Sequence, residues 1–138
     1  EYLAEYGTPT TPADLDAHRL IVYGDDVQAP VENINWLLNE GRPKDEPREP
    51  ALRVNSVYGI YRAVCSGLGI AALPYYLSEE APNLVELLPQ ITGPSIDAYF
   101  VYPEELRHSK RIDVLREFLL AEVKDYRSNI TSRRVDAS

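Results

Sequence analysis

The stretch from residue 51 to residue 74 constrains the fold of this chain more than any other part. Apolar residues recur at helical spacing after Ser56, which is a favourable N-cap residue. Short apolar runs flank this helix on both sides. We therefore predict a strand at 51–54, a helix at 56–66 and a strand at 69–73, which together form a crossover in a parallel sheet.

The two glycines of VCSGLGIAALP, at 64–74, raise the question of whether this stretch binds a phosphate. A dinucleotide-binding loop follows a strand and opens a helix. Here the order is reversed, because Gly67 and Gly69 follow the predicted helix and precede a strand. A third glycine at the required spacing is also missing. The pattern favours Gly67 as the residue with positive φ that ends the helix, and it argues against nucleotide binding.

Along the whole chain, predicted strands alternate with predicted helices, which implies an α/β layer fold. Thr11, Pro12 and Asp14 have the features of a helix start, and this short helix is expected to end near Ala17. Residues 39–50 are dense in charge, proline and glycine, which predicts an exposed loop. The other expected elements are an extended segment or strand at 1–6, strands at 20–23, 34–38, 84–88 and 96–102, a loop at 24–33 and a helical turn at 75–81.

The last predicted element is an amphipathic helix at 110–126. Ser109 can cap it, and its apolar residues recur on one face. That face needs a surface to cover, and the chain offers few strands that other elements do not already claim. From Arg127 onward the sequence is polar and is predicted to be unstructured. The apolar positions of the helix are Ile112, Leu115, Phe118, Leu119 and Val123.

Composition narrows the classes of function. Of the 138 residues 44% are hydrophobic, which predicts a packed core, and the net charge of −8 argues against direct binding of nucleic acid. No apolar run approaches the roughly 18–20 residues that span a membrane. Cys65 is the single cysteine, so no intrachain disulfide is possible, and a reducing compartment is favoured. The chain begins at Glu1 and contains no methionine, so we expect it to be a piece of a longer protein.

No set of side chains in the sequence predicts catalysis or metal binding. His18 and His108 are far apart and lie in no nucleophile motif, and Ser66 does not match the G-x-S-x-G elbow. Adjacent acidic residues point away from one another, so they make poor carboxylate pairs. The spacing of Cys and His fits no metal site. We therefore expect no catalytic residues, no metal and no cofactor.

One stretch, VNSVYG at 54–59, has the features of a binding site. It places the end of a strand directly before the N-terminus of a helix, where free N–H groups and the helix dipole favour an anion. Ligands of open α/β sheets bind beyond the carboxyl ends of the strands. A carboxylate could therefore bind near 56–58, with Asn55 and Ser56 adding hydrogen bonds. Equally, Ser56 could do no more than cap its own helix.

Six segments of the chain, in order, resemble the effector-binding domain of LysR-type transcriptional regulators. The resemblance covers residues 2–123 and is most specific in the Tyr-Leu…Gly-x-Pro-x-x-Pro-x-Asp-Leu…His pattern at 2–18 and in Gly-Leu-Gly-Ile-Ala-x-Leu-Pro at 67–74. The segments are YLAEYGTPTTPADLDAHRLI, INWLL, LRVNSVYGIYRAVCSGLGIAALPYYL, LVELLP, AYFVYP and SKRIDVLREFLLAEV.

The resemblance implies a fold like that of periplasmic binding proteins, with two α/β lobes joined by crossing strands and an effector between the lobes. Residues 1–95 would form the second lobe. Residues 96–126 would supply the return crossing strand and the C-terminal helix, which packs on the first lobe in the family. Residues 127–138 would be a disordered tail. The winged helix-turn-helix domain of the family and most of its first lobe are absent from this sequence.

The resemblance also implies a function and a set of site residues. The chain would be the ligand-sensing part of a cytoplasmic regulator, not an enzyme, and would bind a small, anionic effector. It would contact DNA only through the missing N-terminal domain and would make no contact with a membrane. Self-association is expected from the uncovered helix. A lobe of a transport solute-binding protein, which shares the fold, is the alternative. The effector-binding candidates are Asn55, Ser56, Val57, Leu73 and Tyr102.

Overall fold

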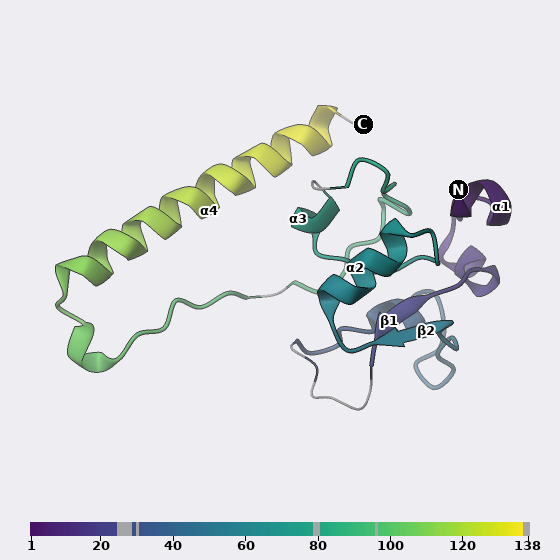
Figure 1. Ribbon diagram of the computed structural model, residues 1–138, viewed down its shortest axis with the longest axis horizontal. Coiled ribbons are helices and arrows are strands. Elements are labelled where there is room, and N and C mark those ends of the chain that lie inside the picture. Colours follow the sequence, from purple (N-terminus) through teal and green to yellow (C-terminus); the bar gives the residue numbers. More distant parts are fainter. Residues whose placement is uncertain (25–28, 30, 79–80, 96, 137–138) are drawn as a thin grey trace. The chain divides into compact units, whose positions relative to one another are not determined.

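The computed structural model describes residues 1–24, 29, 31–78, 81–95 and 97–136 (Figure 1). The chain divides into two compact units, a first unit of residues 1–96 and a second unit of residues 97–138. Each unit is described by itself below.

The first unit is built on a small parallel sheet. Strand β1, Ile21–Tyr23, pairs in parallel with β2, Leu52–Val54, and Ile21 lies beside Leu52. On the other side of β1, a single parallel bridge joins Leu20 to Ile70. Its hydrogen bonds run from Ile21 N to Ile70 O (2.9 Å) and from Ile70 N to Arg19 O (2.8 Å). The predicted crossover is therefore confirmed, but the predicted strand 69–73 is reduced to this one bridge.

Helix α2, Val57–Cys65, connects β2 to this bridge and packs on one face of the sheet (Figure 1). Ser56 caps it as predicted, with Oγ accepting a hydrogen bond from Gly59 N at 3.2 Å. Gly67 follows the helix with φ +71°, the left-handed conformation expected of it. Strand β1 is buried on both faces, since its residues alternate between a cluster beneath α2 and a second cluster on the opposite face.

The N-terminal segment 1–6 was predicted as extended but forms a helix, α1 (Tyr2–Tyr6). The reason is tertiary. The Tyr2 ring is buried in the core, and its hydroxyl accepts a hydrogen bond from Arg19 N at 2.9 Å. Tyr2 Oη also lies 3.2 Å from Nδ1 of His18, which places that histidine in a structural contact.

The short helix after Thr11 is confirmed as a 3-10 helix, η1 (Pro12–Ala17). It begins with a capping box between Thr11 and Asp14. The Asp14 carboxylate accepts hydrogen bonds from the backbone N–H groups of Thr10 and Thr11, both at 2.8 Å. Together with the Thr10 hydroxyl, these bonds lower the pKa of Asp14 to about 2. Because the pKa is lower in the folded state, the Asp14 charge stabilises the fold above about pH 4, and this contribution is lost as the pH falls toward 2.

Residues 34–38, predicted as a strand, instead contain the 3-10 helix η2 (Trp36–Leu38). The Asn35 side chain takes the position that a neighbouring strand would occupy at the end of β1. Its Oδ1 accepts from Tyr23 N and its Nδ2 donates to Tyr23 O, both at 2.9 Å. The sequence does not reveal this, because an amide side chain imitates a backbone only where the fold brings it beside a strand.

The end of the first unit contains helix α3, Tyr75–Ser78, which confirms the start of the helical turn predicted at 75–81; residues 79–80 lie outside the described residues. The strand predicted at 84–88 is wrong. Leu88 has φ +53°, which is incompatible with a continuing strand, and its side chain is buried in the core. In the predicted loop 24–33, residues 25–28 and 30 lie outside the described residues.

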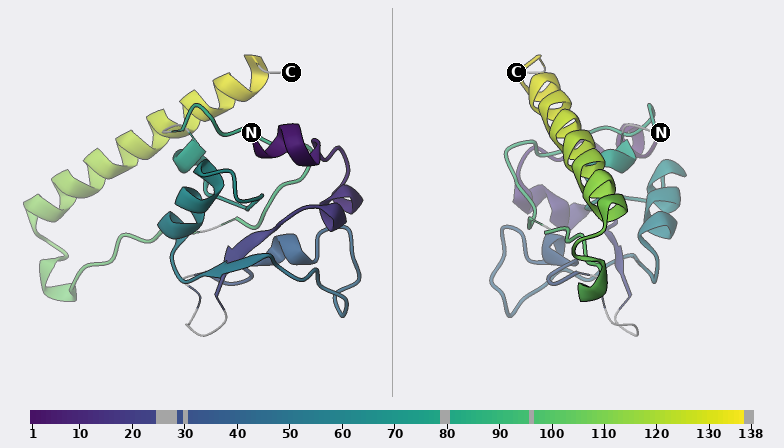
Figure 2. Two further views of the ribbon diagram at one scale, coloured as in Figure 1. Left: turned by 45° about the vertical axis from the view of Figure 1, so that its right-hand side comes forward. Right: turned by 90° about the vertical axis from the view of Figure 1, so that its left-hand side faces the viewer.

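The second unit contains the 3-10 helix η3, Glu104–Leu106, and the long helix α4, Lys110–Asp136 (Figure 2). Helix α4 confirms the predicted helix but continues ten residues beyond 126, where a disordered tail was expected. Neither proline nor glycine interrupts residues 127–136. The predicted return strand is not formed by residues 97–102. A strand needs a neighbour for its backbone hydrogen bonds, and no segment within the described residues pairs with 97–102.

Candidate functional site

The candidate site lies where the carboxyl ends of β1 and β2 meet the start of α2 (Figure 1). Because Tyr23 is paired with Val54, the next residues, Gly24 and Asn55, also lie side by side. Gly24 N donates to Val54 O at 3.3 Å. The Asn55 side chain lies directly against the Gly24 backbone, because a Cβ atom at position 24 would collide with Asn55 Oδ1. Gly24 was not among the predicted site residues, although a glycine directly after a buried strand was a visible signal.

The start of α2 offers hydrogen-bond donors at this edge. Gly59 N is taken by Ser56 Oγ, and Ile60 N donates to Ser56 O at 2.9 Å. The N–H groups of Val57 and Tyr58 come too early in the helix to have an intrahelical acceptor. The Ser56 hydroxyl accepts one hydrogen bond as the cap, and it can still donate its own proton. This arrangement presents up to three hydrogen-bond donors at one edge of the sheet.

The predicted site residues fall into three groups. Asn55 and Ser56 are exposed at the strand edge. Val57 and Leu73 are half-buried and pack against the core clusters beneath α2, so their side chains contribute mainly to packing. Tyr102 belongs to the second unit, where its ring contacts that of Phe100 with centroids 5.5 Å apart.

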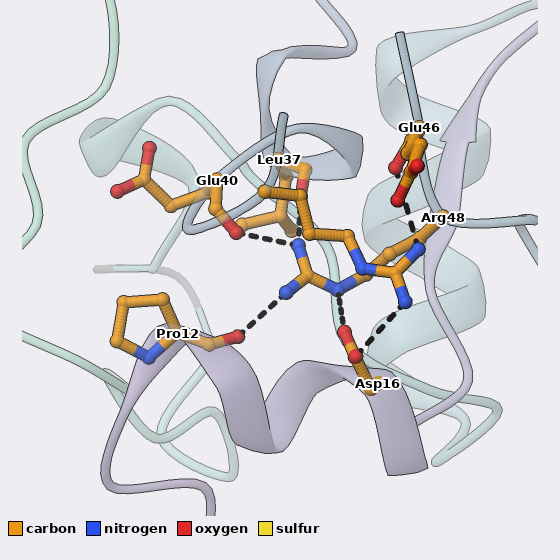
Figure 3. A network of polar contacts seen from close by, with 7 residues as sticks. Pro12, Asp16, Leu37, Glu40, Glu46 and Arg48 are labelled. Carbon is orange, nitrogen blue, oxygen red and sulfur yellow. Dashed lines mark hydrogen bonds and ion pairs between the residues drawn. The ribbon is translucent and has the colours of Figure 1, made fainter. Parts of the chain in front are cut away.

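A second group of polar residues was not predicted at all. Arg48, expected in an exposed loop, is only 5% exposed, and its guanidinium is surrounded by acceptors (Figure 3). Its Nε bonds to Oδ1 of Asp16 at 2.6 Å, and its Nη atoms donate to the carbonyl oxygens of Pro12 (2.8 Å), Glu40 (2.6 Å) and Leu37 (3.4 Å).

The other carboxylate oxygen of Asp16 accepts from Nη2 of Arg42 at 3.0 Å. Hydrogen bonds from Arg48, and then from Arg42, lower the pKa of the Asp16 carboxyl below its ordinary value. Since these groups already bond to one another, the network holds the loop 39–50 against η1. We therefore assign it a structural role.

Within the part of the chain that the structure describes, no group of three or more His, Cys, Asp or Glu residues is arranged to hold a metal ion. None of the helices in the described ranges is long and apolar enough to cross a membrane.

Comparison with known proteins identifies the family. The model of the LysR substrate binding domain matches residues 1–124, so the chain belongs to this family. The resemblance stated from the sequence is therefore confirmed. The family implies an α/β fold like that of periplasmic binding proteins, and the parallel sheet with its crossover helix is compatible with one lobe of that fold.

Curated relatives are regulators. The chain is 28% identical over 137 residues to the uncharacterized HTH-type transcriptional regulator YhjC of Escherichia coli (strain K12). The alignment covers 91% of the chain and 42% of that protein. It is 29% identical over 111 residues to an uncharacterized HTH-type transcriptional regulator of Haemophilus influenzae, covering 78% of the chain and 37% of that protein.

A third relative is the probable HTH-type transcriptional regulator LtrA of Klebsiella pneumoniae, with 27% identity over 124 residues, which covers 86% of the chain and 39% of that protein. The chain thus spans about two fifths of the length of these relatives. No solved structure gives a significant match.

Proposed function

We propose that this chain is the ligand-sensing part of a LysR-type transcriptional regulator that binds a small anionic effector. One observation carries the proposed site: Asn55 and the Ser56-capped N-terminus of α2 meet at the carboxyl edge of the parallel sheet. The N–H groups of Val57 and Tyr58 and the hydroxyl of Ser56 supply donors, and the helix dipole favours negative charge there. The side-chain amide of Asn55 can donate a further hydrogen bond to a carboxylate.

The regulator proposed here would bind DNA through a domain outside this chain, and the effector would control that binding. The family and the printed names of the relatives support this assignment. The net charge of −8 argues against direct binding of nucleic-acid phosphates by this chain. The effector would act by binding one arrangement of the regulator more tightly than another, which shifts the population of the form that binds DNA.

The alternative, a lobe of a transport solute-binding protein, rests on the shared fold alone. A regulator is favoured because the relatives reported above carry the helix-turn-helix designation. An enzyme is not proposed, since these relatives are regulators and the site offers hydrogen-bond donors without a nucleophile and base.

The charge of the effector can be tested by thermal shift of the intact regulator. A panel of small carboxylic acids would be compared with the matching uncharged amides. We expect at least one acid to raise the melting temperature while its amide does not, because binding to the native state stabilises it.

Replacing Ser56 then tests the site with the acid found in that screen. Ser56→Ala should weaken binding about tenfold or more, the value of one hydrogen bond to a charged group. It should also cost about 0.5–2 kcal/mol of stability through loss of the cap. Ser56→Thr keeps the capping hydroxyl but adds a methyl group to the site, so binding should fall while the helix stays intact. Isothermal titration and thermal unfolding measure the two effects separately.

The outcomes distinguish a binding residue from a cap. If Ser56→Ala lowers the melting temperature but leaves the affinity unchanged, Ser56 only caps α2 and the site assignment fails. Gly24→Ala provides an independent check, because the added methyl group displaces the Asn55 side chain without altering the cap. It should weaken binding of the same acid.

We also propose that the apolar residues of α4 pack against a second protein surface, and that the isolated chain self-associates through them. These residues are exposed although burying each large side chain contributes about 1.5–3 kcal/mol. They include Leu115 at 45% exposure, Phe118 at 57% and Leu119 at 38%.

Light scattering after size exclusion tests this expectation on the 138-residue chain. We expect dimers or larger species that become monomers when Leu115 and Leu119 are both replaced by Glu. As a control, Glu117→Gln changes a charge on the same helix without touching these two positions. A strictly monomeric wild-type chain would contradict the proposal.

A further inference from the structure

Residues 87–93, near the end of the first unit, are held to that unit by side chains instead of by a strand. Leu88 is buried in the core, and Leu87 and Ile91 pack against the same cluster. Ile91 N donates to Leu88 O at 2.9 Å, which closes a turn. Gln90 Nε2 adds a hydrogen bond to Thr10 O at 3.3 Å. The segment is therefore fixed to the core at several points.

The last of these points is a contact between Gly93 and the indole of Trp36. A methyl group at position 93 would lie 2.9 Å from Cζ2 and 3.0 Å from Cε2 of the indole, so the ring rests directly on the backbone. Gly93 does not have a positive φ, unlike Gly67. Glycine is thus needed here for the close approach of the ring and not for the backbone conformation.

The position of this contact in the chain matters. Trp36 is part of η2 and packs against the core of the first unit. Beyond Gly93, the described residues 94–95 and 97–101 are exposed, and the second unit begins at residue 97. The Trp36 contact is therefore the last attachment that the structure describes on the first unit before the chain passes to the second.

We propose that Trp36 is a positioning residue that clamps the chain at Gly93, so that any movement of the second unit relative to the first begins beyond Gly93. When the second unit moves, a clamp of this kind prevents residues 87–93 from detaching from the core of the first unit. Hinges are a few residues that absorb the change in φ and ψ between two rigid parts, and the clamp fixes where those residues begin. This inference does not depend on the identity of an effector or on the proposed binding site.

Limited proteolysis with chymotrypsin tests the clamp on the 138-residue chain. Leu87 lies before the clamp, whereas Tyr99 and Phe100 lie beyond it, and all three are cleavage sites. In the wild type we expect cleavage after Tyr99 and Phe100 to precede cleavage after Leu87. Gly93→Val forces the indole away, so cleavage after Leu87 should rise about tenfold relative to cleavage after Tyr99. Trp36 is the only tryptophan, so a red shift of its emission reports that the ring has moved.

Two further variants complete the test. Ser95→Val places the same valine side chain two residues beyond the clamp and should change neither the cleavage ratio nor the emission. Trp36→Phe replaces the indole by a smaller phenyl ring without adding bulk at position 93. It should also raise cleavage after Leu87, and circular dichroism should show that the fold is retained. If Gly93→Val unfolds the chain, Trp36→Phe decides alone. An unchanged cleavage ratio in the folded variants, or preferential cleavage after Leu87 in the wild type, would overturn the proposal.

Discussion

Arg48→Ala is expected to lower the free energy of unfolding of the first unit by about 3 kcal/mol or more. The change removes a buried guanidinium and leaves the carbonyl oxygens of Pro12 and Glu40 without their donor. It also removes the cation that pairs with Asp16 from inside the fold. Since small domains have a total stability of only about 5–15 kcal/mol, chemical denaturation should detect the loss easily.

Arg42→Ala is the matched control for this prediction. Arg42 bonds to the same carboxylate, but its side chain is 34% exposed against 4% for Arg48. An exposed pair contributes about 0–1 kcal/mol, so Arg42→Ala should cost much less than Arg48→Ala. Equal effects of the two replacements would show that burial of Arg48 does not decide the energetics.

The same network predicts a dependence on pH. The pKa of Asp16 is lower in the folded state than in the unfolded state, so its charge stabilises the fold above about pH 4. Asp16→Asn should therefore destabilise the chain at pH 7, and the difference from wild type should narrow as the pH falls below about 4.

Gly69→Ala is expected to cost about 3 kcal/mol or more, through a different mechanism. A Cβ atom at this position would collide with the carbonyl oxygen of Arg19, which accepts the hydrogen bond from Ile70 N. Neither group can move without breaking the bridge between Leu20 and Ile70, because both are backbone. Urea denaturation should show a large fall in the midpoint.

Gly67→Ala separates this steric effect from a conformational one. Gly67 has φ +71°, but the nearest atom to an added Cβ, in Tyr2, is 3.9 Å away. An alanine there carries only the penalty of the left-handed conformation, about 1–2 kcal/mol. If Gly67→Ala proves as damaging as Gly69→Ala, close approach at position 69 is not the dominant constraint.

Local sequence patterns predicted the helix starts and helix ends that are stabilised by residues only a few positions away. The Ser56 cap, the helix that follows it and the helix end at Gly67 all rest on interactions within a few residues. The capping box of η1 is of the same kind. The six sequence segments that resemble the family also led to it, because they occur in the family's order.

The candidate site could be predicted in part for the same reason. Asn55 and Ser56 follow a strand and start a helix, which is visible in the sequence, and the structure places both at the sheet edge. Gly24 comes from a different strand, so its contact with Asn55 exists only because β1 and β2 pair in register.

Sequence alone thus determined the crossover, its caps and the family of the chain, because these depend on local periodicity and backbone conformation. Only the tertiary structure decided which apolar runs became strands. A strand requires a partner, and Asn35 occupies that position beside Tyr23, while the positive φ of Leu88 ends any strand at 84–88. Tertiary structure also buried Arg48, since four acceptors from distant segments converge on one guanidinium only when the chain is folded.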